Sequence, residues 1–473
     1  MNRAAFFATA ALSLLCAGCL EAFETATPTP KKPSASPSAL VSTATPIPAV
    51  PVLIPNATST PRPTTPTPLP PRVSALYASR FGFSSANLGA TGASDDYSLA
   101  TDAGAHWDRP VIGPFNWQEI EYARGQYDFA KADAYLASAS KAGFAVLGVV
   151  WPFNDWDQKA CRPISCNAPE YAGLAKMRCK PCDMNAYKAF LKAMVLRYSN
   201  ADTPVKYWEI ASEPSAGPSG DFFKGSPKEY AELLNASYSA IKEVCSDCMV
   251  LSGGLAGAGQ SQLDFFAQIL DAGGAHYFDI ASIHSVNDGA DGNAAAMRAF
   301  LQSRNASKPV WVTQYSFGSG RYPPRKMPQY GNYFITDDEH ASMVFKGIVA
   351  AFAAGAEKVF YSALRTAAGA DPIRQSQSLV SESNAKRPAF AAYRLLASKL
   401  AHFSRAFSFS QGRYAFAIGN STVYALWGAG SLPKGLPERV MVTDYLGKRT
   451  AMPLSSLIIS DAPVLVEADA SWG

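Results

Sequence analysis

The feature that most constrains the fold is an alternation of short apolar segments with longer amphipathic segments, repeated eight times between residues 75 and 401. Apolar runs of about four to eight residues predict buried strands, and longer runs with helical periodicity predict helices that cover them. Because strands joined by helices run parallel, eight repeats predict an α/β fold, a (β/α)8 TIM barrel with insertions. The expected strands occupy residues 80–83, 107–112, 145–151, 205–210, 249–253, 278–283, 310–313 and 358–361, and the expected helices residues 94–103, 128–142, 185–198, 227–244, 263–271, 293–303, 337–354 and 388–400.

An open, doubly wound parallel sheet is the alternative arrangement. Such sheets usually carry a glycine-rich phosphate-binding turn after the first strand, and no such turn follows residues 80–83. The barrel is therefore favoured. Beyond residue 401 the helical periodicity stops, and a small C-terminal β-sandwich-like domain is predicted over residues 402–473. Its expected strands are residues 414–419, 421–427, 438–444 and 462–466.

The first 18 residues have the features of a bacterial export signal: Arg3, an apolar run over residues 4–15, and small residues before Cys19. The apolar run is too short to span a membrane. Residues 15–19 (LCAGC) resemble a lipobox, with Cys16 where leucine is usual. We therefore expect a lipid on Cys19, with a plain secretory signal as the alternative.

Residues 19–74 are dominated by proline, threonine, serine and alanine. Such a composition cannot bury enough apolar surface to fold, and it favours extended polyproline geometry. We expect a semi-rigid stalk between the lipid and the barrel of residues 75–401. The mature protein would then be an exported lipoprotein on the bacterial cell surface, attached to the membrane through the lipid alone.

The composition limits the possible partners. A chain of 473 residues with 48% hydrophobic residues can bury a large core. The formal net charge of +4 is small, and no block of lysine and arginine is interleaved with aromatic residues, so nucleic-acid binding is not expected. No motif implies a metal or an organic cofactor, and we expect a monomer.

Six cysteines remain after Cys16 and Cys19 are set aside. Four of them lie in the insertion after the third strand with spacing C-x4-C-x12-C-x2-C, which formally resembles a zinc site. In an exported protein, disulfides are the favoured interpretation, and their connectivity cannot be read from spacing. The six candidates for disulfides are Cys161, Cys166, Cys179, Cys182, Cys245 and Cys248.

Reactive groups of a TIM barrel gather at the carboxyl ends of its strands, each supplied by a different strand. The candidates here are Arg109 on strand 2, Glu213 after strand 4, His284 after strand 6 and Gln314 after strand 7. A lone glutamate at a strand end is usually solvated or ion-paired. Glu213 stands out because aromatic residues precede it and Pro214 follows it directly.

These segments resemble those of retaining glycoside hydrolases of the (β/α)8 clan with catalytic carboxylates on strands 4 and 7, of the cellulase-like and xylosidase-like kinds. Residues 208–214 (WEIASEP) are similar to their W-E-I-x-N-E-P, and residues 308–314 (KPVWVTQ) to their K-P-x-W-x-T-E. Residues 278–284 (FDIASIH) resemble the strand-6 segment D-x-x-S-x-H.

The resemblance spans roughly residues 76–468. Residues 105–109 (AHWDR) match the strand-2 segment of this clan only in Trp107 and Arg109. Residues 444–447 and 463–467 resemble its C-terminal β-domain. The partner that the resemblance implies is an oligosaccharide or polysaccharide with O-glycosidic bonds.

The resemblance also implies roles for individual residues. Retaining hydrolysis uses one carboxylic acid to protonate the departing oxygen and a second carboxylate to attack the anomeric carbon. Glu213 matches the acid/base position. Gln314 occupies the nucleophile position, where a neutral amide cannot serve. Arg109 would hold the nucleophile, and His284 would line the same subsite.

Further substrate contacts follow from the same alignment. Ser212 stands where an asparagine normally binds the sugar, and Tyr361 belongs to the strand-8 segment that usually carries a tryptophan under the sugar. Tyr315 and Trp151 complete the expected substrate-binding set. Each of Trp151, Trp156 and Trp208 is as much a candidate for the core as for the cleft.

Three functions remain open from the sequence. In the first, the barrel keeps its sugar cleft but is impaired in hydrolysis because Gln314 replaces the nucleophile. In the second, the protein is an active glycoside hydrolase, with a substrate acetamido group as nucleophile or with a relocated base. The candidate bases are Asp288, Asp291, Glu119 and Glu121. In the third, the chain is a structural surface lipoprotein, with Arg109 as a core ion-pair residue and His284 as a packing residue.

Overall fold

The structure of the protein is a computed structural model. The export segment, Cys19 and nearly all of the predicted stalk lie outside the described residues, as does Asp288. Nothing is described for the side chain of Asp291. The described residues are 71–86, 96–159, 161–171, 173–215, 221–286, 290–318, 336–365 and 372–468.

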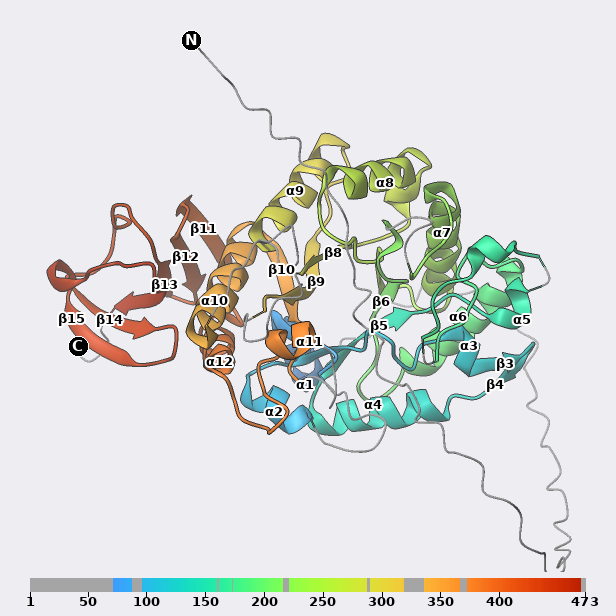
Figure 1. The fold of residues 1–473 in the computed structure, drawn as a ribbon, viewed down its shortest axis with the longest axis horizontal. Coiled ribbons are helices and arrows are strands. Elements are labelled where there is room, and N and C mark those ends of the chain that lie inside the picture. Colours follow the sequence, from blue (N-terminus) through green and yellow to red (C-terminus); the bar gives the residue numbers. More distant parts are fainter. Residues whose placement is uncertain are drawn as a thin grey trace, which may run out of the picture.

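Eight parallel strands form the central sheet and confirm the predicted barrel (Figure 1). Hydrogen-bonded neighbours follow the order β7-β6-β5-β2-β1-β10-β9-β8. Parallel bridges from Leu251 to Ile280 and from Leu255 to Ile283 link the two edge strands. The strands are β1 (Phe81–Ser84), β2 (Trp107–Arg109), β5 (Ala145–Val150), β6 (Tyr207–Ile210), β7 (Met249–Leu251), β8 (Ala281–Val286), β9 (Val310–Ser316) and β10 (Ala356–Tyr361).

Two of the helices that cover the sheet begin at strong helix-start signals in the sequence. In α7, Pro227 occupies the first turn, and Ser226 forms a capping box with Glu229. Thr336 and Glu339 form the same box at the start of α10. The covering helices are α2 (Tyr97–Asp102), α4 (Ala130–Ala142), α6 (Met184–Tyr198), α7 (Pro227–Val244), α8 (Gln260–Asp271), α9 (Ala290–Ser303), α10 (Asp337–Ala353) and α12 (Pro388–Leu400).

Shorter elements lie outside the eight repeats. Helix α1 overlaps the last residues of the predicted stalk and brings Tyr77 against the aromatic rings at the amino end of the barrel. None of the described helices is long and apolar enough to cross a bilayer. The short elements are α1 (Pro71–Ala78), α3 (Trp117–Ile120), β3 (Glu121–Ala123), β4 (Gln126–Tyr127), α5 (Asp155–Gln158) and α11 (Pro372–Gln377).

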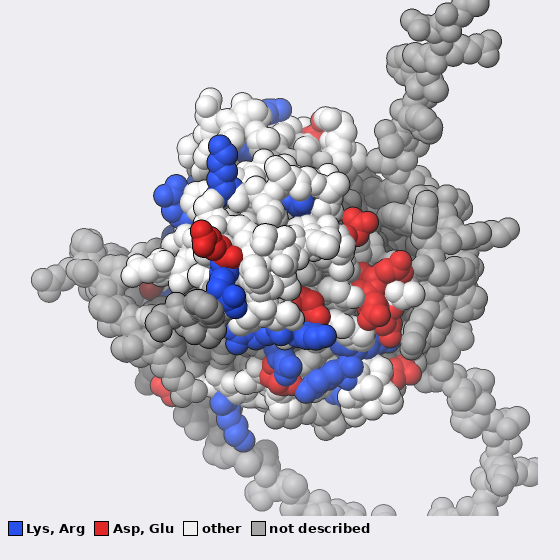
Figure 2. Space-filling model, turned by 90° about the vertical axis from the view of Figure 1, so that its left-hand side faces the viewer, with Lys and Arg blue, Asp and Glu red and all other residues white. Residues whose placement is uncertain are grey.

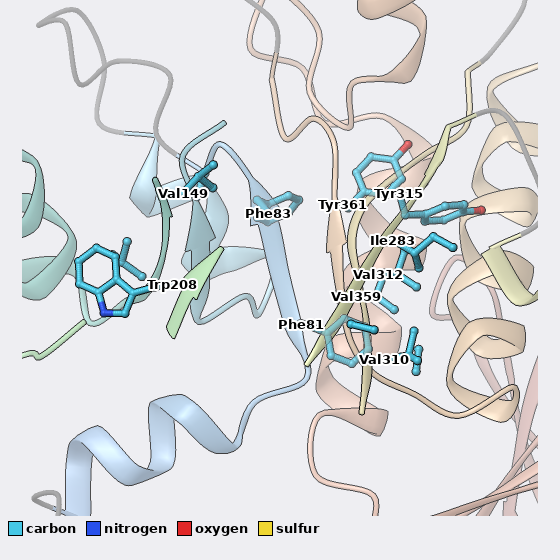
Figure 3. Packing of buried hydrophobic residues seen from close by; sticks show 14 of the residues in the cluster. Phe81, Phe83, Val149, Trp208, Ile283, Val310, Val312, Tyr315, Val359 and Tyr361 are labelled. Carbon is cyan, nitrogen blue, oxygen red and sulfur yellow. The ribbon is translucent and has the colours of Figure 1, made fainter. Parts of the chain in front are cut away.

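The barrel interior changes from aromatic to polar along its axis. At the amino end, Trp107, Tyr207 and Trp311 pack against one another with ring centroids 5.1–5.5 Å apart. At the carboxyl end, the buried side chains of Arg109 and Glu209 occupy the interior. Apolar side chains on the other side of the strands pack against the helices (Figure 3). A polar layer over an aromatic base therefore positions the candidate site.

Two of the predicted strands extend further toward the site than expected. The ladder of β8 continues to Val286 and that of β9 to Ser316, because the two strands pair with each other to their ends. His284 and Gln314 therefore lie within strands instead of following them. At the other end, β8 starts only at Ala281, although Ile280 already bridges to Leu251.

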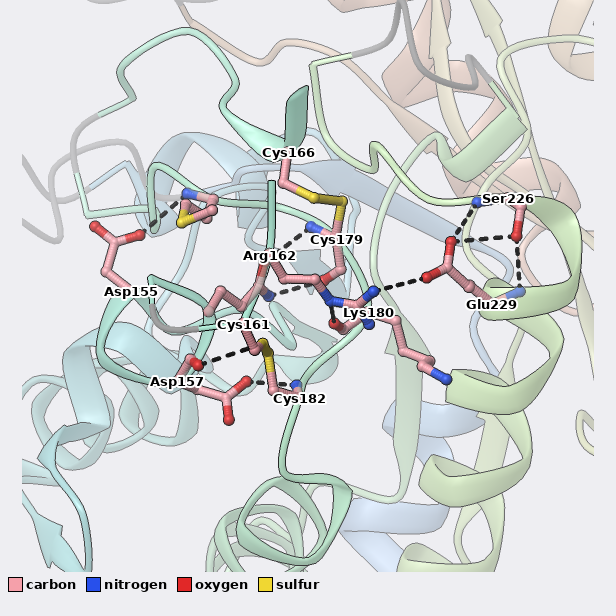
Figure 4. Close-up of a disulfide and its surroundings, with 12 residues drawn as sticks. Asp155, Asp157, Cys161, Arg162, Cys166, Cys179, Lys180, Cys182, Ser226 and Glu229 are labelled. Atoms are coloured by element: carbon pink, nitrogen blue, oxygen red, sulfur yellow. Dashed lines mark hydrogen bonds and ion pairs between the residues drawn. A yellow bond between two sulfur atoms is a disulfide. The ribbon is translucent and has the colours of Figure 1, made fainter. Parts of the chain in front are cut away.

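All six cysteines in the described region form disulfides, as expected. Figure 4 shows the two pairs in the insertion after β5. Cys161 pairs with Cys182, Cys166 with Cys179, and Cys245 with Cys248. The first two pairs are nested and close the insertion after β5. Because these sulfurs are bonded to each other, they are not the thiolates that a zinc site requires.

The C-terminal region folds as a six-stranded antiparallel sheet beside α10 and α12 (Figure 1). Its two edge strands, β11 and β15, were not predicted. Most of their side chains are exposed, and few residues of β15 are apolar. Acidic and basic side chains both occur on the face that includes this sheet (Figure 2). The strands are β11 (Arg405–Ser410), β12 (Arg413–Ile418), β13 (Ser421–Leu426), β14 (Arg439–Asp444), β15 (Arg449–Pro453) and β16 (Val464–Ala468).

Candidate active site

The chain turns sharply where β6 ends, and this turn presents Glu213. Ala211 and Glu213 have φ angles of 60° and 47°, a left-handed conformation that residues other than glycine rarely adopt. The backbone N–H of Glu213 donates to the carbonyl of Gly254 at 2.9 Å. From α7, the hydroxyl of Tyr230 donates to Ile210 O and accepts from Gly253 N–H. Unusual backbone held by several hydrogen bonds is typical of functional sites.

Arg109 and Glu209 form a buried ion pair beneath this turn. Arg109 Nε lies 2.6 Å from Glu209 Oε2, and Nη2 lies 3.0 Å from Oε1. Both side chains have no exposed surface. Glu209 Oε1 also accepts from Gly254 N–H at 2.9 Å and from the Ser282 hydroxyl at 3.2 Å. The carboxylate that Arg109 holds is therefore Glu209, which is not among the residues predicted for the site.

His284 links the ion pair to Glu213. Its Nδ1 lies 2.8 Å from Glu213 Oε1, and its Nε2 lies 3.3 Å from Nη2 of Arg109. The imidazole is 1% exposed, and Glu213 is 8% exposed. His284 thus contacts both Arg109 and Glu213, and three different strands or strand ends supply the three residues.

Gln314 lies beside His284 because β9 contains a bulge. Ile283 pairs with Val312, but the next residue, His284, pairs with Gln314, so Thr313 is an extra residue in β9. The ladder with β10 shows the same shift. A bulge re-aims the side chains that follow it, and residues in register place their side chains on the same face of a sheet. Gln314 therefore shares a face with His284.

The side-chain amide of Gln314 has no hydrogen-bond partner among the side chains and backbone groups of the described segments. The residue is 8% exposed. Ser212 lies nearby, with its hydroxyl 3.4 Å from Arg109 Nη2. It is 2% exposed.

Three aromatic residues predicted to contact substrate are enclosed in this structure. The Tyr315 hydroxyl donates to Met343 O of α10, and the Tyr361 hydroxyl donates to Phe317 O or Gln377 O. Both rings lie among the apolar residues between sheet and helices (Figure 3). Burial raises the pKa of Tyr361 well above its ordinary value, so its hydroxyl remains a donor.

Trp151 is the third of these aromatic residues. Its indole N–H donates to Val111 O at 2.8 Å, and the side chain has no exposed surface. A contact with sugar would require each of these three side chains to leave its present place. Their roles in substrate binding remain predictions.

Of the four carboxylates considered as relocated bases, the structure describes the side chains of two. Glu119 forms an ion pair with Lys131 at 2.7 Å. Glu121 is 2% exposed and accepts from the Trp117 indole and from Gly125 N–H. Both carboxylates are therefore committed to contacts between α3 and the start of α4.

A metal site is not evident among the residues that the structure describes. The one grouping of potential ligands within these residues is Cys245, Asp247 and Cys248. Its two sulfurs form a disulfide, so they are not thiolates, the form in which cysteine binds a metal.

Glu209, Gly254 and Ser282 are the site residues that sequence reasoning missed. One signal was available for Glu209. Alternation along β6 places Trp208 and Ile210 against the helices, so Tyr207 and Glu209 face the interior. A charged side chain inside a barrel requires a partner, and Arg109 was the buried cation to pair with it.

No protein-family model matches the chain, and no curated protein matches it. Solved structures do match. A GH39 β-xylosidase from Caulobacter crescentus has 15% sequence identity and a TM-score of 0.60, with 82% of this chain and 95% of that chain covered. A family 39 glycoside hydrolase from Bacteroides cellulosilyticus WH2 has 18% identity and a TM-score of 0.59, covering 79% and 77%.

A more distant match is the catalytic domain of the GH30 xylanase C from Talaromyces cellulolyticus. It has 14% identity and a TM-score of 0.52, with 82% of this chain and 96% of that chain covered. At such low identity these similarities establish a shared fold. This chain therefore has the barrel and C-terminal sheet arrangement of structures described as glycoside hydrolases, as its motifs indicated.

Proposed function

We propose that this protein binds an oligosaccharide or polysaccharide at the carboxyl end of its barrel and is impaired in retaining hydrolysis. The observation that carries the proposal is the pairing of His284 with Gln314 across β8 and β9. His284 contacts Glu213 at 2.8 Å, so the two positions that would hold the catalytic pair flank one histidine. One position holds a carboxylate and the other an amide.

The chemistry of retaining hydrolysis explains why this difference matters. The mechanism needs two carboxyl groups about 5–5.5 Å apart, one of which bonds to the anomeric carbon. Glu209 does not substitute for the missing group, because it has no exposed surface and four donors surround its oxygens. An amide retains the shape of glutamate and adds an N–H donor. Sugar binding can therefore survive the change when hydrolysis does not.

The similar structures support a carbohydrate as the ligand. Two of them are described as a β-xylosidase and a xylanase, and the fold places Glu213 at the barrel end where ligands of TIM barrels bind. The proposed ligand class is accordingly a glycan with O-glycosidic bonds.

An active hydrolase is the second candidate. The observation in its favour is that the Gln314 amide has no recorded partner within the described segments and could hydrogen-bond a substrate acetamido group that attacks the anomeric carbon. Glu213 would then protonate the leaving oxygen. Under this alternative, only sugars with a 2-acetamido group would be hydrolysed.

We also propose that the barrel is held at the bacterial surface by a lipid on Cys19 and the stalk of residues 19–74. Metabolic labelling with a radioactive fatty acid should mark the wild-type chain and leave Cys19→Ser unlabelled. Labelling of both chains, or of neither, would contradict the anchor without affecting the proposal for the barrel.

The test of binding uses the folded exported chain on a glycan array, with hydrolysis of aryl glycosides and polysaccharides measured in parallel. The proposal predicts saturable binding to at least one glycan, weakened in Glu213→Gln, and no turnover above background. Turnover by the wild type that Glu213→Gln abolishes would overturn the impairment. Binding to no glycan would overturn the carbohydrate function itself.

A further inference from the structure

The contacts of Arg109 bear on which nitrogen of His284 carries a proton. Arginine has five N–H donors and no acceptor. Arg109 Nη2 lies 3.3 Å from His284 Nε2, so this contact is a hydrogen bond only if Nε2 is unprotonated and accepts. The proton of a neutral imidazole must then be on Nδ1, which lies 2.8 Å from Glu213 Oε1.

Arg109 cannot easily turn away from this contact. Its Nε and Nη2 are held by Glu209, and its Nη1 donates to the Ser84 hydroxyl at 3.1 Å. Glu209 is fixed in turn by Gly254 N–H and the Ser282 hydroxyl. With no exposed surface on either side chain, water cannot replace these partners. The guanidinium is therefore a fixed donor toward His284.

The backbone at Gly254 keeps the imidazole in the same place. A Cβ atom at this position would lie 2.2 Å from His284 Nε2, so only glycine allows the ring to sit here. The carbonyl of Gly254 also accepts from Glu213 N–H. Gly254 thus contacts both glutamates that lie near His284. Its N–H donates to Glu209, and its carbonyl accepts from Glu213 N–H.

We propose that Arg109 and Glu209 are positioning residues that fix His284 in the Nδ1–H tautomer, so that His284 donates to Glu213. Glu213 Oε1 then receives an N–H and serves as an acceptor, which suits a carboxylate that binds sugar hydroxyl groups. Donating a proton to a departing oxygen is the opposite task. The role of Glu213 in binding sugar hydroxyl groups rests on the proposed function. The tautomer of His284 does not depend on it.

The first test needs no ligand. It also needs no variant in which the ion pair of Arg109 and Glu209 is broken. The chain has five histidines, so ¹⁵N-histidine labelling gives few signals, and His284→Gln identifies those of His284. We expect a protonated Nδ1 and an unprotonated Nε2 near neutral pH in the wild type. A protonated Nε2, alone or together with Nδ1, would overturn the proposal whether or not the protein binds any glycan.

Substitution of Arg109 tests the cause of the tautomer. In Arg109→Lys the charge opposite Glu209 is kept, but one ammonium group cannot reach both Glu209 and His284 in the manner of a guanidinium. If this variant folds, the Nε2–H tautomer should appear. Persistence of Nδ1–H alone would show that Arg109 does not set it. If the variant does not fold, Gly254→Ala provides the same readout, because it displaces the ring from Arg109.

The second test concerns the glycan that the array identifies. His284→Leu should weaken its binding about tenfold or more, as expected for loss of a hydrogen bond to a charged group. His284→Gln can donate to Glu213 and accept from Arg109, so it should bind more tightly than His284→Leu. Equal binding by the two variants would contradict the donor role of His284, even if the glycan-binding function stands.

Discussion

At the scale of single residues, the candidate site rests on a buried ion pair with no exposed surface. Arg109 is enclosed, and Glu209 is its bidentate partner. Removing one member of a buried ion pair leaves the other charge without compensation, which typically costs about 3–5 kcal/mol. Each member of the pair therefore contributes to stability by compensating the charge of the other.

Glu209→Gln tests this contribution. The substitution keeps the shape of the side chain, so the expected fall in the free energy of unfolding, about 3–5 kcal/mol, is due to the lost charge. Urea unfolding measures it. The control is Asp133→Asn, which breaks the exposed pair with Arg197 and should cost less than about 1 kcal/mol. Equal losses in the two variants would argue against a buried pair.

A second buried charge lies at the opposite end of the barrel. Lys358 Nζ donates to Tyr77 O and Ser79 O, both at 2.6 Å, and lies 4.7 Å from the Trp107 ring. Burial lowers the pKa of Lys358 from 10.5 to about 7, and the nearby positive charge of Arg80 acts in the same direction. The folded state therefore binds this proton more weakly than the unfolded state does.

The sign of the resulting pH dependence follows directly. Between about pH 7 and pH 10.5 the unfolded chain holds more protons at this lysine than the folded chain, so the free energy of unfolding rises with pH. Lys358→Met removes this titration. The difference in unfolding free energy, wild type minus variant, should increase as the pH is raised from 7 to 10. A difference that stays constant over this window would show that the pKa is not lowered.

At the scale of elements, β9 packs closely against α10 at a single glycine of the helix. A Cβ atom at Gly347 in α10 would lie 1.9 Å from the Tyr315 hydroxyl. This close approach holds Tyr315 against the helix, next to the bulge that brings Gln314 into register with His284. The contact between strand and helix thus supports the geometry of the site.

Gly347→Ala should destabilise the protein even though alanine favours helices. The helical gain is up to about 1 kcal/mol, and overpacking typically costs about 1–3 kcal/mol, so we expect a net loss of about 1–2 kcal/mol in urea unfolding. Gly292→Ala in α9 is the matched control, because no heavy atom of the described residues lies within 4 Å of its added Cβ. A gain in stability from both substitutions would contradict the packing of Tyr315.

Local signals in the sequence were sufficient for most elements. Helices α7 and α12 have the predicted bounds, since a proline in the first turn marks each start. The edge strand β11 was missed although Phe407 and Phe409 alternate with serine, because the alternation is short and neither ring is buried. The ends of β8 and β9 were predicted three residues too early, at residues 283 and 313, because the pairing of the two strands determines where each one stops.

The site was predictable only in part. Glu213 and Gln314 were identified because strand ends and motif similarity marked them. The bulge at Thr313 was not, because it appears only when β9 is aligned with β8 and β10. The partner of Arg109 was also missed, since Arg109 and Glu209 lie on β2 and β6, and closure of the barrel brings them together.

At the scale of the whole molecule, the fold and its chemistry point to different conclusions. The closed sheet, the covering helices and the C-terminal sheet are those of structures described as glycoside hydrolases. The position that motif similarity assigns to the nucleophile nevertheless carries an amide, that of Gln314. A shared barrel predicts where a sugar would bind, while hydrolysis depends on individual side chains.

The central claim is that the amide of Gln314 limits hydrolysis. The turnover of Gln314→Glu on an activated aryl glycoside, whose leaving group departs without proton donation, tests it most directly. The variant restores a second carboxylate next to His284, so its turnover should exceed that of the wild type by at least about a hundredfold. Adding Glu213→Gln to this variant should remove the gain. Wild-type turnover as high as that of Gln314→Glu would contradict the claim.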